Sequence, residues 1–447
     1  MRAWNRPEIV SVPGESSAPW LHDTKTDSLV LAQPLDAARL YVCGITPYDA
    51  THIGHANTYL AFDTLQRVWI DAGFRVHYAQ NVTDVDDPLL ERATATGVDW
   101  RALAESQVEL FRTDMEALGI IPPNDFVAVT EVIDEVSAAV ALLQDAGLAY
   151  PVPTDGAIAG ADGRIAEDLY FDIHAAETRT DWTLGDESNL DAASMLRLFA
   201  ERGGDPGRAG KRDRLDPLLW KAARAGEPAW ESSVGAGRPG WHIECSVIAL
   251  KELGTDFTVQ GGGSDLIFPH HDMSAGHAQA LSGHPLAGVY SHTGMVAYQG
   301  EKMSKSLGNL VLVSRLRAQN VDPRAIRLAL LARHYRTDWE WTAAHLDEAI
   351  ARLTAWSAAF GAAAIEGASS GATGISAPAV LGAAAVTASS AAPTGTAATL
   401  VDSLRLALRH DLDTPQALRL VDDAAAGPVD DPALVNRAVS ALLGVAL

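Results

Sequence analysis

Cysteine is scarce in this chain of 447 residues, which contains only Cys43 and Cys245. Two cysteines are too few for a disulfide framework, so reduced thiols or metal ligands are the uses to expect. Apolar runs of membrane-spanning length are lacking too, because prolines and charges interrupt residues 1–20, and Ser, Thr and Pro interrupt residues 377–398. We therefore expect a cytoplasmic protein with no membrane partner.

Basic residues are also few, since 34 lysines and arginines face 57 aspartates and glutamates, a formal net charge of −23. The shortage is greatest at the end of the chain, where residues 346–447 contain no lysine and five arginines. Proteins that bind nucleic acids usually present a basic patch to the phosphates. We therefore expect no nucleic-acid partner.

A strand–helix–strand pattern follows an irregular N-terminal arm of residues 1–38. The apolar run 40–43 predicts a buried strand that ends at Gly44, and residues 75–80 predict a second strand. Between them a helix is expected up to about Asp71, with Thr51 as its N-cap. This pattern predicts an α/β fold in which polar groups gather at the carboxyl ends of the strands.

Two short motifs, about 250 residues apart, carry groups suited to phosphate. His52 and His55 lie in the first turn of the predicted helix, whose N–H groups and dipole favour bound anions. Alone, such a histidine pair is as often a surface pair or a metal-binding pair as a nucleotide-binding one. Lys302 and Lys305 lie on a loop near glycines and can close over a triphosphate as mobile charges.

In this order the two motifs, HIGH at 52–55 and KMSKS at 302–306, resemble the catalytic domain of class I aminoacyl-tRNA synthetases. Segments 238–246, 261–265 and 268–271 are similar to cysteinyl-tRNA synthetase in particular. The resemblance implies a Rossmann-like catalytic domain over 39–300. We expect a helical insertion within it at about 88–147, a loop and helical region over 301–346, and a linker with a small α-helical domain over 347–447.

The resemblance also implies a bound zinc ion. From spacing alone Cys43 and Cys245 are better explained as buried thiols, because they form no compact Cys-x-x-Cys pattern. In the family, residues that match Cys43, Cys245 and His270 hold zinc, with a glutamate four positions after the histidine as fourth ligand. Ser274 occupies that position here, which leaves room for a substrate thiolate, and Asp272 is the alternative ligand.

Activation of cysteine by ATP, together with Mg²⁺, is the first reaction that the resemblance implies. His52 and His55 would steady the phosphates, and Lys302 and Lys305 would neutralise charge on the leaving pyrophosphate. The residues expected around the cysteine and the adenylate are Cys43, Gly44, Ile45, Thr46, Thr58, Asn81, Val82, Thr83, Trp241, Gly263, Ser264, Asp265 and Val296.

The acceptor of the activated cysteine is suggested by a second resemblance. Residues 43–52, Ser274 and the hexapeptide 201–206 look like the mycothiol-pathway ligase family, which joins cysteine to the amino group of glucosaminyl-inositol. We therefore expect L-cysteine, ATP and glucosaminyl-inositol as partners of a monomeric ligase. The alternatives are a cysteinyl-tRNA synthetase with an atypical tail and a non-catalytic adenylate- or zinc-binding paralogue.

The general base for the second step cannot be named from the sequence. The acidic turn Asp84, Asp86 and Asp87 follows the second predicted strand. It can be explained as a solvated helix cap, or as a set of carboxylates that hold the amino-sugar.

Overall fold

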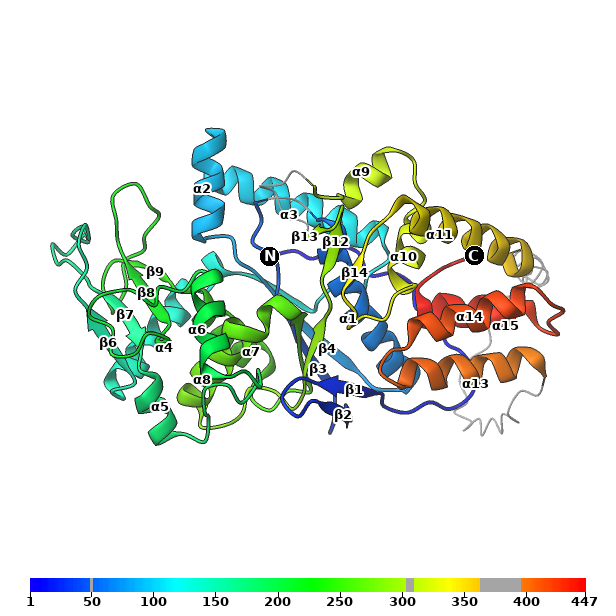
Figure 1. The fold of residues 1–447 in the computed structure, drawn as a ribbon, viewed down its shortest axis with the longest axis horizontal. Helices are drawn as coiled ribbons and strands as arrows, with labels where there is room; N and C mark the ends of the chain where they lie inside the picture. The colour runs from blue at the N-terminus through cyan, green and yellow to red at the C-terminus, as the bar shows by residue number, and fades with distance from the viewer. Residues whose placement is uncertain (49–50, 303–308, 362–394) are drawn as a thin grey trace, which may run out of the picture.

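The computed structural model describes residues 1–48, 51–302, 309–361 and 395–447. A five-stranded parallel sheet lies at its centre (Figure 1), which confirms the expected α/β fold. Its strands run in the order β11 (Tyr290–Thr293), β10 (Val259–Gly263), β3 (Ala38–Val42), β4 (Val76–Val82) and β5 (Asp125–Ala128). Most residues of β3 and β4 are buried, as expected for central strands of a parallel sheet that is covered on both faces.

Helical crossovers connect the parallel strands. Helix α1 (Ile53–Asp71) joins β3 to β4, and α2 (Asp87–Thr96) and α3 (Trp100–Ala117) join β4 to β5. The range 88–147, expected to be a helical insertion, therefore contains a strand of the central sheet. The expectation needs this correction because β5 has only four residues, too few for a clear pattern beside the prolines at 122–123.

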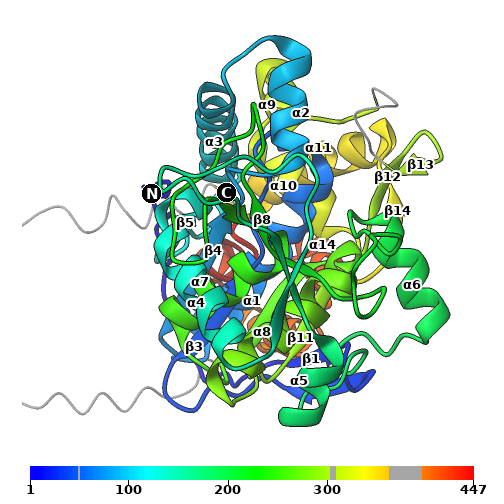
Figure 2. The same ribbon diagram turned by 90° about the vertical axis from the view of Figure 1, so that its left-hand side faces the viewer.

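A second, antiparallel sheet is inserted between β5 and β10, on the left in Figure 1 and toward the viewer in Figure 2. Helix α4 (Ile133–Asp145) leads into it and α7 (Trp241–Leu253) leads back to β10. Its strands are β6 (Ala149–Val152), β7 (Asp168–Phe171), β8 (Leu218–Ala222) and β9 (Gly237–Pro239), with α5 (Ile173–Arg179) and α6 (Ala192–Glu201) between β7 and β8. Local sequence patterns did not predict these strands, because they are short and separated by long polar loops.

The rest of the chain surrounds the central sheet. The N-terminal arm contains the hairpin β1 (Trp20–Asp23) and β2 (Ser28–Leu31). After β10 come α8 (Asp272–Ser282), β12 (Val296–Tyr298), β13 (Glu301–Lys302), α9 (Val313–Ala318), α10 (Pro323–Leu331) and β14 (Trp339–Glu340). The helices on the right of Figure 1 are α11 (Ala343–Trp356), α13 (Thr396–Arg409), α14 (Thr414–Ala425) and α15 (Pro432–Ala438). Among the described residues we find no helix whose length and hydropathy would suit a membrane span.

A buried ion cluster attaches the C-terminal helices to α1. Asp63 accepts a hydrogen bond from Arg67 Nε at 2.8 Å and another from Arg327, and all three side chains are buried. Arg327 Nε also donates to the carbonyl of Leu443 at 2.6 Å, and Arg67 to that of Ala441 at 3.2 Å. Burial opposes ionisation of Asp63, but the guanidinium of Arg327 holds the pKa of this carboxyl below its ordinary value.

Replacing Asp63 with Asn should destabilise the protein strongly, because two guanidinium groups would remain buried without a counter-charge. We expect the free energy of unfolding to fall by about 3–5 kcal/mol. The wild type should lose this contribution as the pH falls through the lowered pKa of Asp63, since a carboxyl with a depressed pKa stabilises the fold only while ionised. Urea titration at several pH values measures both effects.

Asp36→Asn is the matched control, because the pair of Asp36 with Arg75 is exposed. It should change the free energy of unfolding by less than about 0.5 kcal/mol. Equal stabilities of the two variants would contradict the role given to Asp63.

Candidate active site

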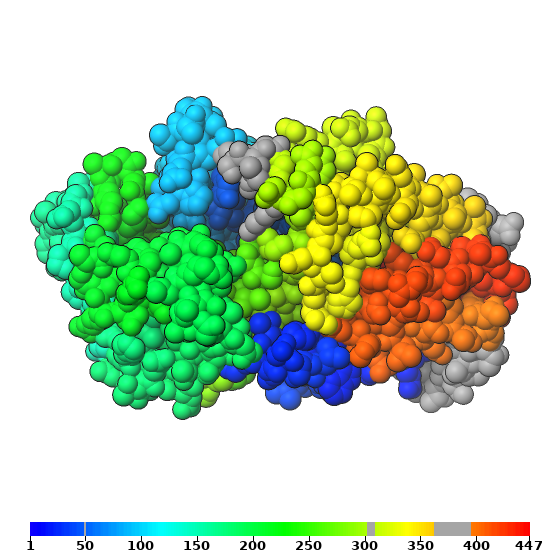
Figure 3. Space-filling model, viewed as in Figure 1, coloured from blue at the N-terminus to red at the C-terminus, as the bar shows by residue number. Residues whose placement is uncertain are grey.

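One cavity of about 1010 Å³ opens at the carboxyl ends of β3, β4 and β10. Strand β3 pairs with β4 on one side and with β10 on the other, so the connections of the sheet change direction at β3. Ligands of open α/β sheets bind at such a point. The space-filling view shows a recess between α2, in light blue, and the green insertion (Figure 3).

The first motif begins helix α1 and faces this cavity. His52, rather than Thr51, is the N-cap, because its Nδ1 accepts hydrogen bonds from the N–H groups of Gly54 at 3.1 Å and His55 at 3.4 Å. An imidazole nitrogen thus makes the bond expected of a hydroxyl. The rings of His52 and His55 stack with centroids 3.8 Å apart, and both line the cavity.

Hydrogen bonds hold the ends of β3 and β4 together. The side chain of Asn81 accepts from the N–H of Gly44 at 2.8 Å and donates to Thr83 Oγ1 at 3.1 Å, and Thr83 N–H donates to Ile45 O at 3.0 Å. A Cβ on Gly44 would lie 1.6 Å from the carbonyl oxygen of Asn81. Only glycine therefore allows the two strand ends to approach this closely.

Most residues predicted around the adenylate do line the cavity. Val82 does not, because side chains alternate along β4: Asn81 faces the cavity, whereas Val82 is buried in the apolar core. Ser264 also lies outside the lining, at the start of a short 3₁₀ turn. The predicted residues that line the cavity are Cys43, Gly44, Ile45, Thr46, Thr58, Asn81, Thr83, Trp241, Gly263, Asp265 and Val296.

The second motif is described only in part. Lys302 ends the short strand β13, which pairs with β12. Lys305 lies outside the described residues, and its predicted role stays a prediction.

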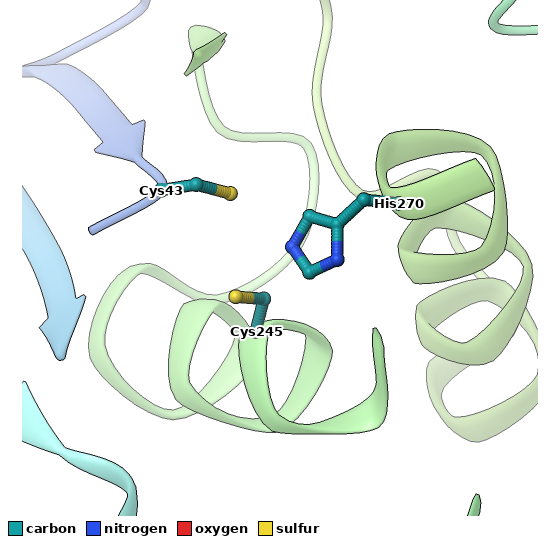
Figure 4. Close-up of side chains that lie close together, drawn as sticks. All are labelled: Cys43, Cys245 and His270. Atoms are coloured by element: carbon teal, nitrogen blue, oxygen red, sulfur yellow. The ribbon is translucent and has the colours of Figure 1, made fainter. Parts of the chain in front are cut away.

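Cys43, Cys245 and His270 converge at the inner end of the cavity (Figure 4). One donor atom from each lies within 4.8 Å of the other two, although the residues come from the end of β3, from α7 and from the turn before α8. All three are buried, with 5%, 3% and 1% of their surfaces exposed. Two thiols and an imidazole in this arrangement form a possible metal site.

Neither Ser274, which occupies the position of the family's glutamate, nor the alternative ligand Asp272 belongs to this cluster. Ser274 Oγ donates to the carbonyl of His242 at 3.2 Å, and the carboxylate of Asp272 accepts from the N–H of Gly185 at 3.0 Å. Burial raises the pKa of Asp272 to about 7. Among the described residues, the cluster therefore has three protein ligands.

Neighbouring aromatic rings hold His270, and a hydrogen bond connects the two thiols. Trp241 stacks on His270 with centroids 4.3 Å apart, and His242 Nδ1 lies 3.0 Å from His270 Nδ1. Burial lowers the pKa of His242 well below its ordinary value, so this ring is neutral. The hydrogen bond from the Cys43 thiol lowers the pKa of Cys245, which favours one thiolate in the pair.

Beyond these residues the cavity continues into a part that we call the polar extension, of which the sequence singled out only the acidic turn, the hexapeptide 201–206 and the segment that begins at Arg238. Ion pairs connect many of its side chains, including Asp168 with Arg224 at 2.8 Å and Asp87 with Lys221 at 2.9 Å. Its acidic members are Asp86, Asp87, Glu91, Asp168 and Asp205. Its basic members are Arg202, Arg208, Lys221, Arg224 and Arg238.

Comparison with known families agrees with this geometry. The family described as tRNA synthetases class I (C) catalytic domain matches residues 32–351. A ligase of Clavibacter michiganensis, named L-cysteine:1D-myo-inositol 2-amino-2-deoxy-alpha-D-glucopyranoside ligase, is 62% identical over 100% of this chain and 99% of its own. A protein of the same name from Thermobispora bispora is 53% identical over the full length of both chains.

The chain belongs to this ligase family. It thereby also belongs to the class I tRNA synthetases, as the order of the two motifs had suggested. Among solved structures, methionyl-tRNA synthetase of Mycobacterium tuberculosis with methionyl-adenylate has a TM-score of 0.60 at 15% identity, over 92% of both chains. The LeuRS of Agrobacterium radiobacter has a TM-score of 0.60 at 12% identity, over 92% of this chain and 84% of its own. These two likenesses show the fold.

Removing either thiol should abolish metal retention. We expect Cys43→Ala and Cys245→Ala to weaken metal binding by more than about a hundred-fold. Losing a residue that only orients a metal ligand already costs up to about a hundred-fold, and losing the ligand itself should cost more. Metal content after dialysis, measured by elemental analysis, tests this. Ser274→Ala is the control and should retain the metal, because its hydroxyl bonds to His242 O. Loss of metal from this variant would contradict a site of three protein ligands.

Proposed function

We propose that the protein activates L-cysteine with ATP as cysteinyl-adenylate and transfers it to the amino group of glucosaminyl-inositol. The products are an amide, AMP and pyrophosphate. The observation that carries the proposal is one cavity that holds both the histidine motif and the Cys43–Cys245–His270 cluster, in a chain 62% identical to a ligase of that name.

The first step needs positioning and charge compensation. His52 and His55 would contact the phosphates at the positive end of the α1 dipole. Lys302 and Lys305, with Mg²⁺, would compensate charge on pyrophosphate, as the family resemblance implies. Gly263 and the other lining residues predicted from the sequence would surround the adenylate.

The metal that we propose for the cluster is zinc. Two thiolates and an imidazole are ligands that zinc prefers, and a fourth position stays open. When bound, zinc would supply that position to the thiol group of cysteine, which binds it far better than the hydroxyl of serine. Such a distinction needs no editing domain.

The second step requires a neutral amine, and the structure distinguishes the three acidic residues of the turn. Asp84 accepts hydrogen bonds from the N–H and the hydroxyl of Thr130, and Asp87 pairs with Lys221 and Arg238. Asp86 lines the cavity, and its carboxylate caps α2 by accepting a hydrogen bond from the N–H of Asp87 at 2.8 Å. We propose Asp86 as the group that binds the amine and takes its proton.

The localisation follows from the same reaction. ATP and free cysteine are available in the cytoplasm, where thiols remain reduced. We therefore propose a cytoplasmic enzyme, and we propose that it works as a monomer.

The proposed function is tested by offering glucosaminyl-inositol and cysteine tRNA in parallel to purified enzyme with ATP and labelled cysteine. We expect amide formation with the amino-sugar and no charged tRNA. Charged tRNA without amide would instead indicate a cysteinyl-tRNA synthetase. If neither product forms and cysteine-dependent exchange of pyrophosphate into ATP is missing too, the protein is a non-catalytic paralogue.

Asp86→Asn should slow amide formation at neutral pH by at least about a hundred-fold, the usual contribution of a general base. Burial and the neighbouring Asp87 raise the pKa of Asp86 to about 6, against the opposing charges of Arg238 and Lys221. The buried carboxyl group of Glu244 lies near enough to Asp86 for an electrostatic interaction between the two groups. The wild-type transfer rate should therefore fall as the pH drops through about 6. This acidic limb of the pH–rate profile should vanish in the variant.

Asp99→Asn is the matched control, because Asp99 caps α3 as Asp86 caps α2, and Asn caps a helix equally well. It should leave the transfer rate unchanged, and neither variant should alter pyrophosphate exchange. The same acidic limb in Asp86→Asn would show that another group takes the proton.

A further inference from the structure

No residue of the hexapeptide 201–206 has a role in the proposed adenylate site or in the metal cluster. Four of its residues nevertheless line the cavity: Arg202, Gly203, Gly204 and Asp205. It follows α6, which ends at Glu201. It therefore lies within the polar extension and is continuous with the space where cysteine would be activated.

The backbone of this loop has a shape that its sequence explains. Gly203 has a φ of +88°, which favours glycine, and a Cβ on Gly204 would lie 2.4 Å from the ring of Phe199. Arg202 Nη1 donates to the carbonyl of Asp265 at 2.6 Å and to that of Phe268. The loop is thus fixed against the segment that carries both Asp265 and His270.

Asp205 presents an immobilised carboxylate to the cavity. Its Oδ1 accepts from Lys211 Nζ at 2.8 Å, and its Oδ2 accepts from the hydroxyl of Tyr170. The side chain of Lys211 is 2% exposed, whereas that of Asp205 is 41% exposed. Each carboxylate oxygen can accept more than one hydrogen bond, so Asp205 retains acceptor capacity on its exposed side.

The charges of the polar extension favour an uncharged ligand. Its acidic and basic members are equal in number, and most are paired with one another. A surface for a polyanion would instead carry an excess of lysine and arginine. Closely spaced donors and acceptors with no net charge suit a ligand with many hydroxyl groups.

We propose that the loop 202–205 forms the subsite for the polyhydroxyl part of the acceptor, and that Asp205 determines specificity by accepting hydrogen bonds from its hydroxyl groups. Arg202 is a positioning residue that holds this subsite against the adenylate segment. This assignment rests on the proposed function, because it concerns the acceptor of the same reaction.

The test compares two acceptors, glucosaminyl-inositol and free glucosamine, and adds hydroxylamine, which traps the adenylate without needing a subsite. In Asp205→Asn the kcat/KM for glucosaminyl-inositol should fall about ten- to hundred-fold, mainly through KM, as expected for losing hydrogen bonds to a charged group. The preference for glucosaminyl-inositol over glucosamine should shrink accordingly. Pyrophosphate exchange and hydroxamate formation should stay unchanged.

Tyr170→Phe provides a second variant that keeps the charge of Asp205 but removes one of its anchors. The same preference should fall by only about two- to ten-fold, because the variant removes an anchor of the carboxylate and not the carboxylate itself. Asp162→Asn is the control, because Asp162 lies outside the cavity lining and pairs with Arg164 at the surface. It should change none of these quantities.

The outcomes separate this proposal from the proposed function. Unchanged preference in both Asp205→Asn and Tyr170→Phe, with the wild type forming amide, would overturn the assignment of the subsite alone. An equal loss of pyrophosphate exchange would show that the loop serves adenylation, and would also overturn it. A wild type that forms no amide with either sugar would overturn both.

Discussion

The position of β3 between two parallel neighbours is the constraint on which the site depends. Because β4 and β10 flank β3, their carboxyl ends meet at one edge, and each contributes a loop to the same cavity. Cys43 directly follows β3, Asn81 is the penultimate residue of β4, and Gly263 ends β10. The close approach of Gly44 to Asn81 fixes these ends, so that the metal ligands and the histidine motif share one wall.

The part of the fold that local patterns could predict is the part with regular periodicity. The strand–helix–strand unit through α1 is found close to where the sequence places it. The strands of the inserted sheet have three to five residues each and were missed. Strand β5 was taken for part of a helical segment for the same reason.

The site divides in a similar way. Resemblance to a family brought Cys43, Cys245 and His270 together, since no spacing rule connects residues so far apart in the chain. The strand alternation that places Val82 in the core could have been applied to the sequence. The ion pairs of the polar extension could not have been predicted, because they connect α2 and the segments around β7, β8 and β9 and exist only once these elements have folded together.

The acidic, lysine-free end of the chain has a structural explanation. Arg405 forms two hydrogen bonds of 2.8 Å with Asp71 at the end of α1, and Arg352 pairs with Asp422 within the C-terminal helices. The Arg405–Asp71 pair and the Asp63 cluster hold the C-terminal half of helix α1. Because the N-terminus of the same helix carries His52 and His55, we infer that the C-terminal helices support the phosphate site by fixing the helix that presents it.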